Sequence, residues 1–236
     1  MLDRTNFIDL KVPDGTTMAA YVSRPQDATK HPGIMVFQEA FGVNAYIRDV
    51  ADRFAKEGFT AIAPELFHRT GPGFEGSYTD FAQTQQHISK LTNDNLESDV
   101  KAAYEWLIKD SWTDPHNICS IGFCMGGKVS FLADSTLPLK AAVSFYGGGI
   151  AQGLLDRAKN LYGPILLFWG GLDKHILPEQ TRAVEDALHA AGKEFGNVTF
   201  SYADHGFFCD QRAAYNERAS KQAWPMTLEF LKYHLK

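Results

Sequence analysis

A cysteine stands at the centre of a short glycine-rich motif, Gly122-Phe123-Cys124-Met125-Gly126. The spacing fits a turn so sharp that side chains two positions before and after the nucleophile would collide. An apolar run precedes the motif and a helical pattern follows it, which is the context that such a turn requires. The Cys124 sulfur would then be raised from the edge of a sheet as a nucleophile. The Met125 N–H, at the helix N-terminus, would point to a developing oxyanion. The alternative is a buried structural thiol.

A thiol nucleophile needs a base, and a histidine and an aspartate stand at suitable places. Asp173 follows the apolar run Pro164–Trp169, and His205 follows the run Val198–Tyr202. The order nucleophile, acid, histidine, with the last two beyond successive strands, is that of α/β-hydrolases. Because the carboxyl ends of parallel strands share one edge, we expect these loops to open on the same edge as Cys124.

Other titratable residues have weaker claims to these roles. Asp204 and Asp210 lie within a few residues of His205 and are poorly placed to orient its ring. His175 follows the predicted acid by two residues, and His68 lies in an irregular loop. We interpret the remaining histidines as surface or helix-end residues.

Short apolar runs alternate with helical patterns along most of the chain. Several runs are apolar on both faces, which is typical of parallel strands covered by helices on each side. These runs are Gly33–Gln38, Thr60–Ala63, Asn117–Phe123, Ala141–Tyr146, Pro164–Trp169 and Val198–Tyr202. The helical patterns are Tyr46–Glu57, Asp80–Lys90, Asn95–Lys109, Met125–Ala133, Pro178–Ala191 and Ala213–Leu235. The alternation predicts an α/β fold with a mostly parallel central sheet and helices on both faces.

Turn and capping residues mark the limits of several elements. Pro13-Asp14-Gly15 separates the runs Phe7–Val12 and Met18–Ser23, which predicts a β-hairpin before the strand–helix repeats. Asp94 is predicted to be the N-cap residue of a helix. Gly192 follows a helical run, as a glycine at the C′ position does.

The composition is that of an ordinary globular protein, because 44% of its 236 residues are hydrophobic and 22% are charged. A chain of this length buries enough surface to fold without a metal ion or a disulfide. No repeat, low-complexity segment or linker interrupts it. We therefore expect a single α/β-hydrolase domain over residues 1–236.

Charge and cysteine content limit the partners and the compartment. The net charge is −5 and no block of Lys or Arg occurs, so we expect neither nucleic acid nor an anionic membrane as a partner. Three cysteines, an odd and small number, argue against a disulfide framework and for a reducing compartment. Without a signal peptide or an 18-residue apolar stretch, the expected location is the cytoplasm.

The sequence resembles the dienelactone hydrolase (carboxymethylenebutenolidase) family. The resemblance rests on Gln38–Asn44, Ala63–Phe67, Gly122–Gly127, Asp173 and His205–Phe207, which occur in order from about residue 30 to the C-terminus. It implies the α/β-hydrolase fold and a triad made of the cysteine, aspartate and histidine described above.

The resemblance also assigns roles beyond the triad. Glu39 would hold the thiol in the resting enzyme, and we hypothesise that it protects the sulfur from oxidation until substrate arrives. The N–H groups of Ala40 and Met125 would form the oxyanion hole. Apart from the resemblance, Tyr146, Phe207 and Phe208 would line the substrate site by their positions; the alternative is plain packing.

One departure from the family concerns the substrate. Family members that act on dienelactone carry arginines that bind its carboxylate, one of them four residues after the histidine. Here that position is Cys209, and the segment Thr79–Lys90 contains no arginine. Arg212 and Arg69, the latter in the irregular stretch Phe67–Ser77, are the substitutes. We therefore predict small neutral esters or lactones as substrates.

These features together predict a hydrolase that works through an acyl-enzyme without a cofactor or a metal ion, as a monomer or small homo-oligomer. Gly71–Gly76 matches G-x-G-x-x-G but opens no helix, and zinc-binding motifs are absent. A class I glutamine amidotransferase would need His-x-Glu, whereas Phe207 stands two residues after His205. The other alternative is a non-enzymatic, thiol-based ligand-binding or redox-sensing protein, which would need no aspartate or histidine partner.

Overall fold

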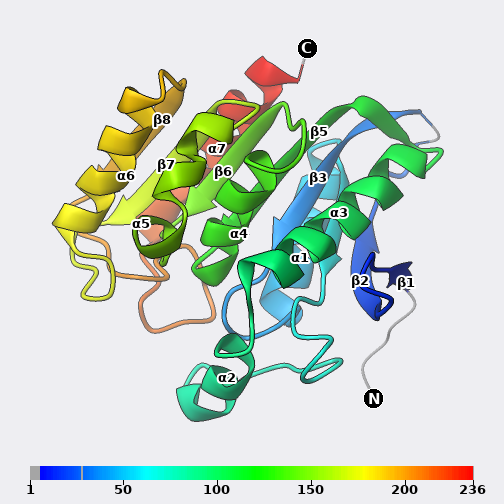
Figure 1. The fold of residues 1–236 in the computed structure, drawn as a ribbon, viewed down its shortest axis with the longest axis horizontal. Coiled ribbons are helices and arrows are strands. Elements are labelled where there is room, and N and C mark those ends of the chain that lie inside the picture. Colours follow the sequence, from blue (N-terminus) through cyan, green and yellow to red (C-terminus); the bar gives the residue numbers. More distant parts are fainter. Residues whose placement is uncertain (1–5, 28, 236) are drawn as a thin grey trace. The chain divides into compact units, whose positions relative to one another are not determined.

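The computed structural model describes residues 6–27 and 29–235 (Figure 1). The chain divides into two compact units, one ending at Cys119 and the other beginning at Ser120. Strand β5 (Thr113–Phe123) crosses this boundary.

The first unit is built on the strand order β1-β2-β4-β3-β5. β1 and β2 form the predicted antiparallel hairpin, with Gly15 at a φ of 88° in its turn. β2 pairs antiparallel with β4, and β4 pairs parallel with β3. The bounds are β1 Phe7–Lys11, β2 Thr17–Ser23, β3 His31–Phe37 and β4 Thr60–Pro64; the helices are α1 Ala45–Lys56, α2 Phe81–Ile88 and α3 Asn93–Lys109.

Helix α1 has a side-chain cap at its start and one apolar face that is buried. The Asn44 side chain accepts the Ile47 N–H at 3.2 Å and begins the helix. The apolar residues of α1 recur at helical spacing and are buried against the strands. They are Tyr46, Ile47, Val50, Ala51, Phe54 and Ala55.

The second unit continues with the order β5-β6-β7-β8, in which β6, β7 and β8 pair in parallel. Every residue of β6 and β7 is buried, as the doubly apolar runs predicted. α4 packs on β6, and α7 packs on β6 and β7 from behind in Figure 1. The bounds are β6 Ala141–Phe145, β7 Ile165–Gly170, β8 Phe195–Phe200, α4 Met125–Asp134, α5 Ile150–Gly153, the 3-10 helix Leu155–Asn160, α6 Pro178–Ala190 and α7 Glu217–His234.

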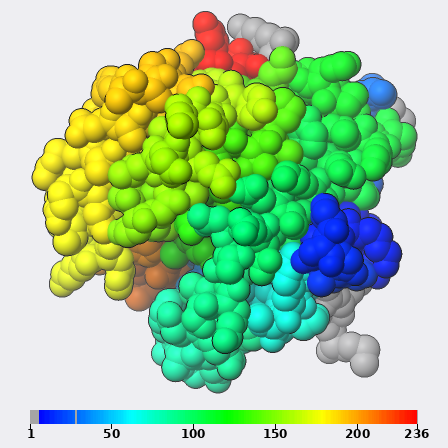
Figure 2. Space-filling view, viewed as in Figure 1, coloured from blue at the N-terminus to red at the C-terminus, as the bar shows by residue number. Residues whose placement is uncertain are grey.

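Helix α6 shows an exposed face as well as a buried one. Val184 and Leu188 are its buried residues, one helical turn apart. Much of the rest of the helix forms the yellow surface along one edge of the space-filling view (Figure 2).

Some element limits predicted from the sequence were wrong. The cap of α3 is Thr92, whose hydroxyl accepts the Asn95 N–H at 3.2 Å, so Asp94 lies inside the helix. α7 begins at Glu217 and not at Ala213, because the Asn216 side chain caps the Ala219 N–H at 3.0 Å. α5 and the 3-10 helix were not predicted, since neither is long enough to show a periodic pattern.

Strand β8 was also misplaced. It begins at Phe195 and ends at Phe200, whereas the apolar run suggested Val198–Tyr202. Only Phe200 in it is buried, so the apolar pattern is weak. Within the described residues, no helix combines the length and apolar character needed to span a bilayer.

Candidate active site

The elbow predicted around Cys124 is present in the second unit. Cys124 joins β5 to α4 with a φ of 55° and a ψ of −118°, in the region that side-chain-bearing residues rarely adopt. Its N–H donates to the Phe145 carbonyl at 3.0 Å. A Cβ atom on Gly122 would lie 1.9 Å from the Gly126 carbonyl oxygen, so glycine is required there. The strained turn places the sulfur at the start of α4.

Close packing explains Gly127, the glycine that follows the motif. A Cβ on Gly127 would come within 2.8 Å of the Gly147 Cα and of the Phe145 carbonyl oxygen. The absence of a side chain therefore lets the first turn of α4 approach the end of β6.

The side chains of Cys124, His205 and Asp173 form a continuous chain of contacts. His205 Nε2 lies 3.1 Å from Cys124 Sγ, and His205 Nδ1 lies 2.7 Å from Asp173 Oδ2. The other oxygen of Asp173, Oδ1, accepts the N–H groups of His175 at 2.7 Å and Ile176 at 3.0 Å. The structure thus brings together the three residues that the sequence order singled out.

The loop after β7 lies against the loop after β8 through backbone contacts. The Gly171 N–H donates to the Phe200 carbonyl at 2.8 Å, and the Leu172 N–H donates to the Ala203 carbonyl at 2.9 Å. A Cβ on Gly171 would lie 2.5 Å from the Ser201 Cα. The glycines before Asp173 are therefore needed so that its loop can reach the one that carries His205.

Charge and burial act in opposite directions on the histidine. Burial makes the largest contribution and lowers the pKa of His205, but the negative charge of Cys124 and the hydrogen bond to Asp173 together raise the pKa to about 10. For Asp173, burial again contributes most and raises the pKa, yet the hydrogen bonds from His205, His175 and Ile176 outweigh it and lower the pKa. The arrangement therefore favours the protonated His205 imidazole and the ionised Asp173 carboxylate.

Two aromatic residues predicted to line the site lie close to His205. The Tyr146 ring is centred 5.0 Å from the His205 ring, and the Phe207 ring packs edge-on to Tyr146 at 5.3 Å. Tyr146 has a φ of 39°, and both aromatic side chains are 0% exposed. Both rings therefore belong to the packed interior beside His205. Their contact with a substrate stays a prediction.

Of the predicted arginines, Arg212 lies beside the histidine loop. Gly206, the residue after His205, has a φ of 82°, and a Cβ there would lie 2.2 Å from Arg212 Nη1. The guanidinium therefore packs on the backbone next to His205.

Arg69 has a structural role in the first unit that the sequence did not reveal. Its Nε and Nη2 donate to Asp14 at 2.8 and 2.6 Å, and its Nη1 and Nη2 donate to the buried Asp99 at 2.9 and 2.8 Å. A substrate carboxylate would have to compete with both partners, so Arg69 is poorly placed to be the substitute cation.

The other residues considered in the sequence are buried or form hydrogen bonds. Glu39 and Ala40 follow β3 and are 1% and 2% exposed. Cys119 is fully buried, its thiol donates to the Gly33 carbonyl at 3.4 Å, and burial raises its pKa. Asp204 accepts the backbone N–H of His205 at 2.7 Å.

Sequence reasoning overlooked one neighbour of the histidine. The His175 ring packs edge-on to the His205 ring, with centroids 5.5 Å apart and an interplanar angle of 78°. In the sequence, the only indication of this contact is that His175 lies two residues after Asp173. That position does not show where the His175 ring points.

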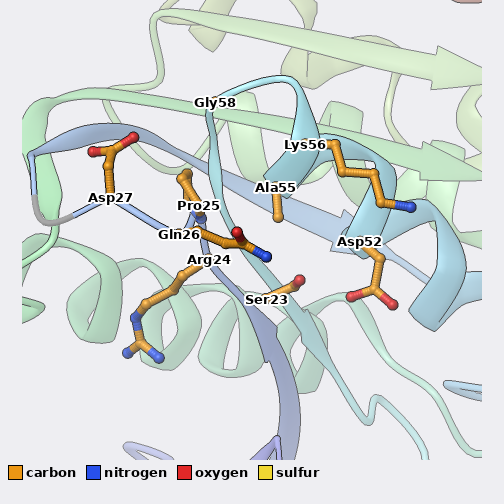
Figure 3. A pocket seen from close by; sticks show the side chains of 9 residues that line it. All are labelled: Ser23, Arg24, Pro25, Gln26, Asp27, Asp52, Ala55, Lys56 and Gly58. Carbon is orange, nitrogen blue, oxygen red and sulfur yellow. The ribbon is translucent and has the colours of Figure 1, made fainter.

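A hollow of about 700 Å³ lies in the first unit, and none of the predicted site residues lines it (Figure 3). Arg24, Asp27, Asp52 and Lys56 are its charged lining residues, and it includes no cysteine or histidine. Within the described residues, no group of three or more His, Cys, Asp or Glu side chains is arranged to hold a metal ion.

Comparison with known proteins decides the family. The family model described as "Dienelactone hydrolase family" matches residues 18–235. The chain belongs to the dienelactone hydrolase family. It is 35% identical over 228 residues to a "Putative carboxymethylenebutenolidase" of Synechocystis sp., covering 93% of each chain. It is 34% identical to a protein of the same name from Escherichia coli (strain K12), covering 93% of this chain and 84% of that one.

A solved structure supports the same assignment. A "Putative Dienelactone Hydrolase" from Klebsiella pneumoniae superposes with a TM-score of 0.86 at 33% identity, covering 96% of this chain and 98% of the other. The α/β-hydrolase fold predicted from the sequence is thus confirmed. So is the prediction of an enzyme, a hydrolase of the carboxymethylenebutenolidase type.

Proposed function

We propose that this dienelactone hydrolase family member cleaves small carboxylic esters or lactones with Cys124 as its nucleophile. The observation that carries the proposal is the contact chain from Cys124 Sγ through His205 to Asp173, with distances of 3.1 and 2.7 Å, at a strained strand–helix elbow. A redox sensor would need only a reactive thiol, so the contacts of His205 with both Cys124 and Asp173 favour the enzyme.

The first half of the reaction is acylation. The Cys124 thiolate attacks the substrate carbonyl carbon, and the carbonyl oxygen gains a negative charge. The Met125 N–H at the start of α4 stabilises this oxyanion, joined by the Ala40 N–H as the family resemblance implies. The carbon–oxygen bond then breaks, and His205 gives its Nε2 proton to the departing alkoxide, which leaves a thioester on Cys124.

The second half is hydrolysis of the thioester. His205 Nε2 now takes a proton from water while the water oxygen attacks the acyl carbon. Collapse of the tetrahedral intermediate breaks the carbon–sulfur bond, releases the carboxylic acid product and returns the thiolate and imidazolium. Asp173 holds the Nδ1 proton throughout, so that Nε2 always faces the sulfur and the water.

Glu39 completes the proposal. We infer that this buried carboxylate, which follows β3, restrains the Cys124 sulfur and protects it from oxidation until substrate arrives, as the family resemblance implies. Alkylation of Cys124 by iodoacetamide should be faster with a substrate analogue that leaves the sulfur accessible. Equal labelling with and without such an analogue contradicts this role.

The main experiment compares Cys124→Ala with Cys119→Ala in the hydrolysis of a chromogenic ester. The first change should reduce kcat by about 10⁴-fold or more. The second should leave it nearly unchanged, because Cys119 is a buried core thiol. Near-normal turnover by Cys124→Ala excludes the mechanism. A sensor would instead show no turnover in the unaltered protein, while its thiol still reacts.

A further inference from the structure

The His175 ring contacts the predicted general base but forms no part of the proposed triad. It is solvent-exposed, and it packs edge-on to His205 at a centroid distance of 5.5 Å. Its backbone N–H donates to Asp173 Oδ1 at 2.7 Å. The same carboxylate therefore fixes the main chain of His175 through one oxygen and the ring of His205 through the other.

The next residue anchors the same segment. Ile176 is 8% exposed, and its N–H also donates to Asp173 Oδ1, at 3.0 Å. Its side chain packs near Gly148, where a Cβ atom would lie 3.8 Å from the Ile176 Cδ1. Because the N–H groups of His175 and Ile176 are both bound to Asp173, the main chain that carries the His175 side chain is held beside His205.

Two kinds of contact restrain the His205 ring in the resting protein. The polar contacts are Cys124 Sγ at Nε2 and Asp173 Oδ2 at Nδ1. The packing contacts are the Tyr146 ring at 5.0 Å and the His175 ring at 5.5 Å. Acylation of Cys124 consumes the thiolate and removes one polar contact together with its charge. The neutral imidazole is then held by Asp173 and by the two rings.

We propose that His175 is a positioning residue that keeps the His205 imidazole in place for hydrolysis of the acyl-enzyme. The inference rests on the proposed function, because it needs a thioester on Cys124. It predicts that losing the His175 ring harms the second half of the reaction more than the first. Acylation by an activated ester starts with the thiolate still in place, and its leaving group needs little help from an acid.

The experiment measures the two half-reactions separately with p-nitrophenyl acetate. Acid quenching and mass spectrometry follow the rise and decay of the acetylated protein, while absorbance follows p-nitrophenolate. The variants are His175→Ala, which removes the ring, and His175→Phe, which keeps an aromatic ring without its nitrogens. The matched control is Lys174→Ala, an exposed neighbour. His175→Gln serves as a second ring-deleting variant if the alanine protein does not fold.

The ring deletion should slow decay of the acetylated protein by about 2- to 12-fold, the effect of losing one aromatic packing pair. Its rate of formation should stay within about twofold of the unaltered protein. His175→Phe should restore the decay rate, and Lys174→Ala should change neither rate.

Three outcomes overturn the inference. Equal slowing of both half-reactions means that His175 has no specific role after acylation. A higher KM with an unchanged decay rate means that it contacts substrate instead. Failure of His175→Phe to restore decay means that a ring nitrogen, and not packing, matters. By contrast, no acetylated protein at any time, or full turnover by Cys124→Ala, rejects the proposed function itself.

Discussion

The carboxylate of Asp173 lies 2.7 Å from Nδ1 of His205, and two backbone N–H groups bind its second oxygen. Its orientation is thus set by its own loop before it meets the ring. A carboxylate in this position accepts a hydrogen bond from the Nδ1–H of His205 and leaves Nε2 facing the Cys124 sulfur.

Replacing Asp173 by Asn should test this arrangement. The amide keeps an acceptor for the backbone N–H groups of its loop, but it presents a donor or a weaker acceptor to Nδ1 and favours the wrong tautomer of His205. We expect kcat to fall by about 10⁴-fold with little change in thermal stability. Asp204→Asn is the control, since Asp204 Oδ1 accepts the backbone N–H of His205 and not a ring N–H. Steady-state ester hydrolysis distinguishes them, and equal losses in both variants contradict the assignment of Asp173.

A second prediction concerns the charge of the histidine. The thiolate and the carboxylate raise the pKa of His205 to about 10, so the imidazolium should persist through neutral pH. Cys124→Ala removes one of these charges while the burial that lowers the pKa remains. NMR titration of the His205 ring should therefore show a lower pKa in Cys124→Ala and no change in Cys119→Ala. An identical His205 titration in all three proteins contradicts the ion pair.

A third prediction concerns the elbow. Gly122→Ala would place a Cβ atom 1.9 Å from the Gly126 carbonyl oxygen, whereas Gly153→Ala in α5 would meet no heavy atom within 4 Å. We expect the first variant to lose about 3 kcal/mol or more of unfolding free energy, together with its activity. The second should resemble the unaltered protein. Urea denaturation and ester hydrolysis measure both effects, and a stable, active Gly122→Ala protein is incompatible with the turn described.

Local signals explain which features the sequence predicted well. The runs of β6 and β7 are apolar on both faces because both faces are buried, so their composition reveals their position. The elbow was predicted because the requirement for Gly122 is local: a Cβ atom there would meet the carbonyl oxygen of Gly126, four residues along the chain. Strand β8 has one buried residue, which leaves little apolar pattern to locate its ends.

Contacts between distant segments explain what the sequence did not reveal. The partners of Arg69 lie 55 and 30 residues away, at Asp14 and Asp99, and no local pattern links them. The ring contact between His175 and His205 likewise depends on how two loops fold against each other. Both cases concern charged or polar side chains whose partners are set by tertiary structure.

A fourth prediction follows from a buried acid outside the proposed site. Asp134, at the end of α4, is 0% exposed; its Oδ1 accepts the Gly163 N–H at 3.0 Å, and Oδ2 makes no hydrogen bond within the described residues. Burial raises the pKa of Asp134 from 3.8 to about 8, against smaller lowering by the Gly163 N–H and by Lys193. The neutral carboxyl is therefore the form that suits the fold.

The sign of the pH effect follows from that shift. Because the folded pKa is the higher one, the stability contributed by neutral Asp134 is complete below about pH 4 and is lost as pH rises to about 8. Asp134→Asn cannot ionise, so its stability relative to the unaltered protein should increase over this range, by at most about 1.4 kcal/mol per pH unit. Urea unfolding at a series of pH values measures the difference. A difference independent of pH shows that Asp134 is ionised in the folded protein.

The fifth prediction concerns the substrate and starts from the two arginines. Binding a carboxylate in a pocket requires a cation to replace its lost hydration, and a bidentate arginine does this well. Arg69 already donates four hydrogen bonds to Asp14 and Asp99. Arg212 packs on Gly206 beside His205, so it is the better placed of the two.

We expect small neutral esters and lactones to be hydrolysed with a higher kcat/KM than matched substrates that carry a carboxylate. A carboxylate bound without a cationic partner costs several kcal/mol, on the order of a hundredfold or more in kcat/KM. The measurement is a panel of matched pairs assayed with the unaltered protein, Arg212→Ala and Arg69→Ala. The same measurements can also contradict the prediction. If the carboxylated members are preferred and Arg212→Ala abolishes that preference, Arg212 binds the substrate carboxylate and the prediction of neutral substrates is wrong. Arg69→Ala is expected instead to weaken folding, because it removes the guanidinium that donates two hydrogen bonds to the buried Asp99.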